Sequence, residues 1–138
     1  KTSMYGLPNA EKSPYKISSE NLEKNNPDGV LTEFPLLVTN FLGKKIPAAG
    51  GFYLRSLPIK ITKNAIKNYE KQGIPSSFYI HSWELTPEYM PKLELPFKDN
   101  FATFHNIDDT YKRMNEILEE FEFTSFANYI SQEMNLPN

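Results

Sequence analysis

The sequence predicts a mixed α/β fold, and three observations support this prediction. A β-prone apolar run spans residues 30–38, a second spans residues 76–85, and two strong helical patterns accompany them. At 138 residues, the chain is long enough to bury a core as one domain. The strands and the two or three helices are nevertheless too few for a closed α/β domain of this length. We therefore expect the chain to form part of a larger sheet or barrel.

The composition excludes several classes of function. The formal net charge is −2, so a large basic surface for nucleic acid is not indicated. No apolar run approaches the roughly 20 residues that a membrane helix needs, so we expect no membrane span. The chain has no cysteine, which excludes disulfides, cysteine nucleophiles and thiolate zinc sites. The cytoplasm and the cell envelope both stay open as locations, because exported proteins also occur without cysteine.

The chain divides into two regions of different pattern. Residues 1–29 have little apolar periodicity and contain three prolines, so we expect an extended and looped segment laid over a body. Residues 30–138 form the expected body of strands and helices. Its first strand is interrupted at Pro35, where we expect a bend, and a turn at 42–45 leads to a loop of small residues at 46–51.

Helical patterns occupy much of the remaining chain. The first has a polar cap, Thr62, and a glycine stop, Gly73. The second begins at Asp108, whose side chain is expected to cap exposed N–H groups, and the third follows the cap Thr124. Residues 87–100 contain three prolines and are expected to form an irregular loop. The helices are expected at residues 62–72, 108–121 and 124–131.

The segment at residues 77–85 carries the side chains best suited to chemistry. Because side chains alternate along a strand, Tyr79, His81 and Trp83 are expected to share one face. Histidine titrates near neutral pH and serves as a general acid or base in many enzymes. The alternative is a buried histidine that hydrogen-bonds to the backbone, and spacing alone favours this alternative.

Short motifs follow one another in a distinctive order along most of the chain. They are Tyr-Gly-Leu-Pro-Asn-Ala at 5–10, Glu-Phe-Pro at 33–35, Phe-Leu-Gly-Lys-Lys-Ile-Pro at 41–47, Gly-Gly-Phe-Tyr-Leu-Arg-Ser-Leu-Pro at 50–58 and His-Ser-Trp-Glu at 81–84. In this order the chain resembles the C-terminal part of polysaccharide deacetylases found with exopolysaccharide and exosortase gene clusters. These enzymes belong to carbohydrate esterase family 4, the NodB-like group. Ser82 departs from the family, which has a stiffening proline at this position.

The resemblance implies a metal-dependent deacetylase that hydrolyses N-acetyl groups of an amino-sugar polysaccharide. It also implies an α/β fold that is the C-terminal portion of a distorted (β/α)7 barrel, incomplete in this chain. The family's upstream aspartates and its His-x-x-x-His motif are absent, since the sequence holds only His81 and His105. Asp108 and Asp109 lie in the wrong order to replace them. A divalent metal such as zinc is therefore expected in the full-length enzyme, and none in this chain.

The resemblance also implies roles for individual residues. His81 would be the general acid that protonates the leaving amine. Trp83 would form a wall of the sugar pocket or pack over the barrel mouth, and Glu84 would orient a neighbour or pair with a cation such as Arg55. The residues expected near the substrate, with a structural role as the alternative for each, are Trp83, Arg55, Gly50, Gly51 and Glu84.

The expected partners follow from an incomplete barrel. They are the polysaccharide substrate and the missing N-terminal half, or a second copy in a homodimer that covers the exposed strand edges. The chain begins at Lys1 without an initiator methionine, so we expect it to be a fragment that is inactive alone. Two alternatives stay open: a non-catalytic carbohydrate-binding or accessory module of exopolysaccharide biosynthesis, which the 14% aromatic content would suit, and a structural domain with His81 in its core.

Overall fold

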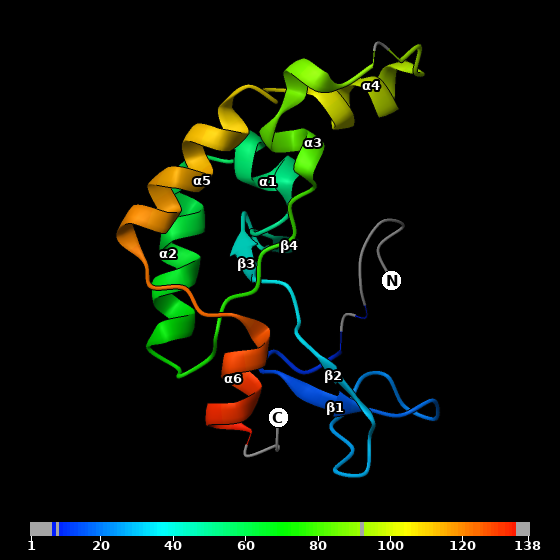
Figure 1. The fold of residues 1–138 in the computed structure, drawn as a ribbon, viewed down its shortest axis with the longest axis vertical. Coiled ribbons are helices and arrows are strands. Elements are labelled where there is room, and N and C mark those ends of the chain that lie inside the picture. The colour runs from blue at the N-terminus through cyan, green and yellow to red at the C-terminus, as the bar shows by residue number, and fades with distance from the viewer. Residues whose placement is uncertain (1–6, 8, 92, 135–138) are drawn as a thin grey trace.

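The computed structural model describes residues 7, 9–91 and 93–134. Tyr5, Gly6 and Pro8 of the first motif therefore lie outside the described residues. The elements, in chain order, are β1 (Tyr15–Ile17), β2 (Leu31–Glu33), β3 (Val38–Phe41), β4 (Lys44–Pro47), α1 (Gly51–Ser56), α2 (Ile59–Glu70), α3 (Ser82–Leu85), the 3-10 helix η1 (Pro87–Tyr89), α4 (Phe97–Phe104), α5 (Asp109–Glu120) and α6 (Phe126–Glu133). They form an elongated arc with α4 at one end and the β1–β2 pair at the other (Figure 1).

The described strands form two separate antiparallel pairs, β1 with β2 and β3 with β4. Tyr15 lies opposite Glu33 in the first pair. β3 and β4 form a hairpin whose turn holds Leu42 at φ 49° and Gly43 at φ 76°. Glycine takes a positive φ without steric cost, so Gly43 suits this turn. The predicted turn is confirmed, although its last two residues already belong to β4.

The strand predicted at residues 30–38 is split into two strands. β2 ends at Glu33 and β3 begins at Val38, so the break lies around Pro35 as expected. Proline has no N–H to donate to a neighbouring strand, which ends regular pairing there. The predicted loop at 46–51 is shorter than expected, because β4 continues to Pro47 and α1 begins at Gly51.

The hydrophobic core lies between the β3–β4 hairpin and the helices α1, α2 and α5. α2 turns one face inward, with Thr62 and Ala65 among its buried residues, as expected of an amphipathic helix. Gly73, at φ 67°, ends this helix as predicted. Thr62 is not its cap, because α2 begins three residues earlier, directly after Pro58. The buried core residues are Leu37, Ala48, Ala49, Leu54, Ala65, Ile66, Tyr69 and Ile117.

A network of ion pairs ties α2 to α5, which lie side by side in Figure 1. Lys63 Nζ lies 2.5 Å from Glu116 Oε1 and 2.8 Å from Glu120 Oε2. Lys67 Nζ lies 2.6 Å from the other carboxylate oxygen of Glu120. Two lysines and two glutamates therefore join the helices along their outer edge.

The strand predicted at residues 76–85 is wrong from residue 82 on, where helix α3 begins. Ser77 and Tyr79 make isolated parallel bridges to Leu36 and Gly50, and the chain then enters α3. The cause is local: the carboxylate of Glu84 accepts a hydrogen bond from the backbone N–H of the helix cap three residues earlier. This capping box starts a helix at a place where the alternating pattern predicts a strand.

Three predictions about the later helices are corrected in their details. The irregular loop predicted at 87–100 contains η1 and the start of α4, whose N-cap position is Pro96. Asp108 is the N-cap position of α5, but its side chain makes no capping hydrogen bond. The cap of α6 is Ser125 and not Thr124, because Ser125 Oγ accepts from the N–H of Asn128 at 3.1 Å.

The barrel that the sequence resemblance implies is not tested by the described residues, so it stays a prediction. The sheets in the part of the chain that the structure describes are the two antiparallel pairs, and the 77–79 segment makes single bridges to Leu36 and Gly50, which lie outside both pairs. Among the same residues, no helix is both long and apolar enough to cross a membrane.

Candidate functional site

Most of the residues singled out from the sequence meet where α1 and α3 approach each other. Arg55 lies in the last turn of α1, Glu84 lies in α3, and His81 is the N-cap residue of α3. Tyr79 and Trp83 flank the histidine on either side in the sequence. We call these five residues the His81 cluster.

Arg55 is the buried anchor of the His81 cluster, with only 1% of its surface exposed. Its Nη1 forms an ion pair with Oε1 of Glu84. Its Nε donates to the backbone oxygen of His105 at 2.8 Å, and its Nη2 donates to those of Ala102 and Thr103 at 2.7 and 3.0 Å. These carbonyls belong to the C-terminal end of α4, where backbone oxygens have no partner within the helix. Arg55 therefore fastens α3 and α4 to α1.

Glu84 connects this anchor to the histidine. The sequence left open whether Glu84 orients a neighbour or pairs with Arg55, and the structure has it doing both. One oxygen pairs with Arg55, and Oε2 lies 3.2 Å from Nδ1 of His81. An ionised carboxylate only accepts hydrogen bonds, so this contact favours the tautomer with the proton on Nδ1. Nε2 is then left to accept from the hydroxyl of Tyr79, 3.0 Å away.

Aromatic rings surround the imidazole on two sides. The indole of Trp83 stacks on it with ring centroids 5.4 Å apart, and the ring of Tyr79 meets it edge-on at 4.7 Å. The His81 side chain is 45% exposed, so the ring is open to solvent on its remaining side. The three rings do gather as predicted, but Trp83 reaches the others from a helix and not from a strand. Tyr79 was not predicted as a site residue, although its spacing of two from His81 was the available signal.

The two glycines predicted near the substrate belong to the start of α1. Gly51 is its first residue, and a Cβ atom there would overlap the carboxylate of Glu84. Gly51 therefore permits the close approach of α1 and α3. At Gly50, a Cβ would lie 3.7 Å from the ring of Tyr53, which is ordinary contact.

The arrangement is that of a histidine held by a buried carboxylate. The carboxylate fixes the orientation of the ring. The described residues contain no group of three or more His, Cys, Asp or Glu side chains able to hold a metal. A histidine that a carboxylate orients in this way suits proton transfer, and a divalent metal stays an expectation for the full-length protein.

His105 lies outside the His81 cluster. It caps the C-terminal end of α4, its ring stacks on Phe101 with centroids 4.4 Å apart, and its backbone oxygen binds Arg55.

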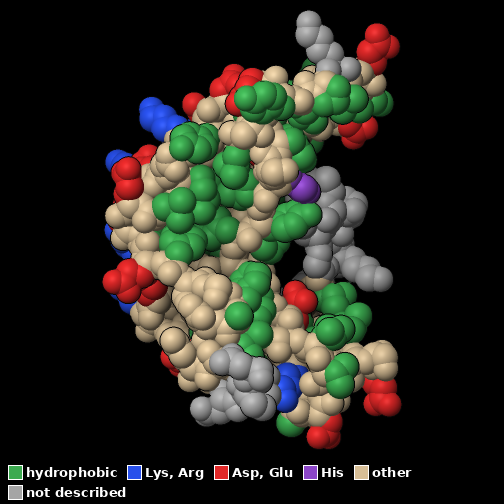
Figure 2. All heavy atoms as spheres, in the orientation of Figure 1, with side chains coloured by type: hydrophobic (Ala, Val, Ile, Leu, Met, Phe, Trp, Pro, Cys, Tyr) green, Lys and Arg blue, Asp and Glu red, His purple; other side chains and the backbone are tan. Residues whose placement is uncertain are grey.

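Hydrophobic side chains gather over α4 at this end of the molecule (Figure 2). Phe97 is 85% exposed there.

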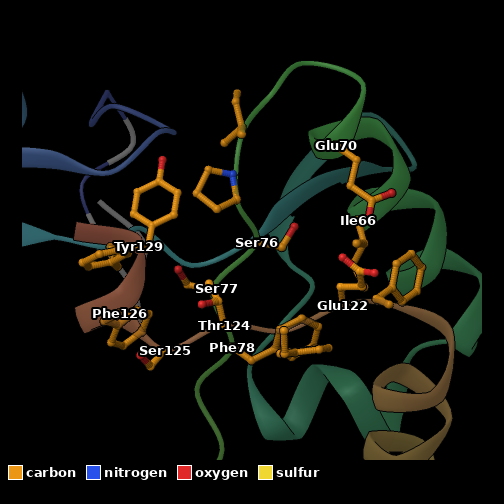
Figure 3. Close-up of a pocket in the computed structure, with 15 residues that line it drawn as sticks. Ile66, Glu70, Ser76, Ser77, Phe78, Glu122, Thr124, Ser125, Phe126 and Tyr129 are labelled. Carbon is orange, nitrogen blue, oxygen red and sulfur yellow. The ribbon is translucent and has the colours of Figure 1, made fainter. Parts of the chain in front are cut away.

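A cavity of about 170 Å³ lies away from the His81 cluster, between the end of α2, the 74–78 segment and α6 (Figure 3). Its lining combines aromatic rings with hydroxyl groups and two carboxylates. None of its lining residues was predicted as a site residue, and none belongs to the His81 cluster. The available signal was the phenylalanine-rich run at residues 121–126.

The fold and the His81 cluster define a mixed α/β domain that presents a carboxylate-oriented histidine to solvent. The chain belongs to the family described as a domain of unknown function (DUF3473), whose model matches residues 1–131. This span contains the whole His81 cluster and all five motifs. No curated protein and no solved structure matches the chain.

Proposed function

We propose that this chain is the C-terminal part of a metal-dependent polysaccharide deacetylase and that His81 is its general acid. The observation that carries the proposal is the contact between Nδ1 of His81 and the buried Oε2 of Glu84, in a histidine whose side chain is 45% exposed and whose Nε2 faces the hydroxyl of the half-exposed Tyr79. The order of the five motifs supports it, because that order resembles the deacetylases of carbohydrate esterase family 4. The family match over residues 1–131 spans the same motifs.

The reaction that we propose is the hydrolysis of an acetamide. Water adds to the carbonyl carbon, the C–N bond breaks, and the nitrogen takes up a proton as it leaves, so the products are acetate and a free amine. An amine is a poor leaving group unless it is protonated, which is why this step needs a positioned acid. Nε2 of a protonated His81 would supply the proton, and the charge of Glu84 would stabilise the imidazolium.

The remaining residues of the His81 cluster receive supporting roles in this proposal. Arg55 and Glu84 are buried, so we assign them to positioning and not to contact with the sugar. Trp83 stacks on the histidine and offers an aromatic wall to the substrate. The Tyr79 hydroxyl occupies the place of the leaving nitrogen beside Nε2, and its half-exposed side chain can rotate away when a substrate binds.

The metal of the proposed enzyme does not fit the described residues of this chain, which hold no suitable cluster of ligands. We therefore assign no step of the reaction through a metal to these residues. The ligands, like the rest of the barrel, are expected in a preceding segment of the full-length enzyme.

The test is the substitution His81→Gln in the full-length protein that contains this chain, with the deacetylation of an N-acetylglucosamine oligomer as the assay. We expect turnover to fall by about 10²–10⁴-fold, the usual contribution of a general acid. His105→Gln is the matched control, because His105 lies outside the His81 cluster, and it should leave turnover unchanged. Both variants should keep the thermal stability of the parent. Undiminished turnover in His81→Gln would refute the proposal.

A further inference from the structure

We propose that the cavity beside α6 binds one ring of a glycan that carries a free amino group. The proposal goes beyond the function above, because the cavity shares no residue with the His81 cluster. Its volume is about 170 Å³. An engineered protein cavity of about 150 Å³ binds benzene, so this cavity has room for a single six-membered ring.

Aromatic rings form one side of the cavity. Phe34 and Phe126 stack with ring centroids 4.3 Å apart, and Tyr129 meets Phe34 edge-on at 5.7 Å. Figure 3 shows Phe126 and Tyr129 together on this side, where both project from α6. A pyranose ring has an apolar face of C–H groups and a polar rim of hydroxyls. The aromatic side offers a surface for the apolar face.

Hydroxyl groups form the middle of the cavity. Ser76, Ser77 and Thr124 lie between its aromatic side and its acidic side (Figure 3). The Oγ of Ser76 is buried and has no hydrogen-bond partner among the described residues. Thr124 is an exposed residue, so its hydroxyl can pair with a ligand that carries hydroxyls of its own. This favours a sugar over a hydrocarbon.

Two carboxylates lie on the opposite side, together with the apolar residues Ile66 and Phe78, and select for charge (Figure 3). Glu70 and Glu122 both line the cavity there, and both are exposed residues (Figure 3). No lysine, arginine or histidine is among the described residues that line it. The nearby ammonium of Lys67, 5.7 Å from the ring of the lining residue Phe121, is paired with Glu120. The two lining carboxylates therefore repel an anionic ligand and attract an ammonium group. The amino group of a deacetylated hexosamine is such a group, and an N-acetylated residue lacks the charge.

The experiment titrates the isotope-labelled 138-residue chain with a glucosamine trimer and with the N-acetylated trimer, followed by NMR. We expect the glucosamine trimer to shift the amide signals of Ser76, Thr124 and Phe126, and to bind about fivefold more tightly than the acetylated one. The double variant Glu70→Gln/Glu122→Gln should remove this preference, as should high salt. Phe126→Ala should weaken the binding of both trimers.

Two controls make the outcome decisive. Glu119→Gln removes an exposed carboxylate on α5 that does not line the cavity, and it should keep the preference. His81→Gln should also keep it; loss of binding in that variant would place the sugar at the His81 cluster and overturn the proposal. Equal or tighter binding of the acetylated trimer would overturn it too, as would a preference that survives the double substitution. None of these outcomes depends on turnover, so the experiment tests this proposal independently of the deacetylase assignment.

Discussion

Arg55 and Glu84, 29 residues apart in the sequence, form a buried ion pair that joins α1 to α3. Their side chains are 1% and 4% exposed. The second oxygen of Glu84 contacts Nδ1 of His81, so the pair that holds the two helices together also orients the histidine. Stability and site geometry therefore depend on the same two side chains.

The first prediction concerns this ion pair. Arg55→Leu leaves the charge of Glu84 buried without its partner and frees three carbonyls of α4, so we expect a loss of about 3–5 kcal/mol in the free energy of unfolding. Urea unfolding followed by circular dichroism measures it. Lys60→Ala, at an exposed position of α2, is the control and should change stability by about 0.5 kcal/mol or less. A similar small loss in Arg55→Leu would contradict the prediction.

The second prediction separates the two adjacent glycines at the start of α1. Gly51→Ala places a methyl group against the carboxylate of Glu84, so the helices must shift, at an expected cost of about 1–3 kcal/mol. Gly50→Ala meets only ordinary contact with Tyr53 and, at φ −85°, keeps an allowed backbone, so it should be nearly neutral. Denaturant unfolding of the two variants tests the difference. Equal stability of both would show that Gly51 is not required for close packing.

The third prediction concerns pH and the ion pairs between α2 and α5. Hydrogen bonds with Glu116 and Glu120 raise the pKa of Lys63 above its usual 10.5. Hydrogen bonds from Lys63 and Lys67 lower the pKa of Glu120 below its usual 4.5. The contribution of Glu120 to the free energy of unfolding is therefore present above pH 4.5 and is lost as the pH falls through the lowered pKa. The contribution of Lys63 to the free energy of unfolding is complete below pH 10.5 and is lost as the pH rises through the raised pKa.

The measurement compares the melting temperature of the parent with that of Glu120→Gln as a function of pH. The variant should be less stable near neutral pH, and the gap should close in strong acid and narrow at high salt, because the groups are on the surface. Glu119→Gln, one residue away and outside the network, serves as the control. A gap that stays constant into acid would show that the charge of Glu120 does not contribute.

The long-period patterns in the sequence predicted the fold better than the short ones did. The helices at 59–70 and 109–120 were recognised because an apolar stripe repeated over about three turns outweighs uncertainty at any single residue. The boundary residues Thr62 and Thr124 were misassigned, because several nearby hydroxyls compete for a cap and only tertiary packing decides among them.

Four of the five residues of the His81 cluster were predicted as site residues, whereas Tyr79 and the geometry of the cluster were not. An alternating pattern of aromatic residues suggested a strand through His81, while Glu84 three residues later supplied the competing helix signal, and the local hydrogen bonds favoured the helix. The carbonyls that hold Arg55 come from the C-terminal end of α4, a helix that was not predicted and whose first residues fall in the loop expected at 87–100. No pattern in the sequence indicates that a helix 47 residues away supplies these partners.

The fourth prediction concerns the tautomer of His81. The Glu84 carboxylate is placed to accept a hydrogen bond from Nδ1 of His81, and the Tyr79 hydroxyl is placed to donate one to Nε2. The neutral imidazole should therefore carry its proton on Nδ1. The ¹⁵N shifts of the labelled imidazole report which nitrogen is protonated. Glu84→Gln keeps the shape of the side chain but removes the acceptor-only carboxylate, so it should admit the other tautomer.

Tyr79→Phe is the matched variant, because it removes the partner of Nε2 and leaves Glu84 in place. It should keep the proton on Nδ1. A general acid needs its transferable proton on the exposed nitrogen, and a ring held through Nδ1 takes up and releases protons at Nε2 alone. A neutral His81 protonated on Nε2 in the parent would therefore contradict the positioning role of Glu84, and it would remove the observation on which the deacetylase proposal rests.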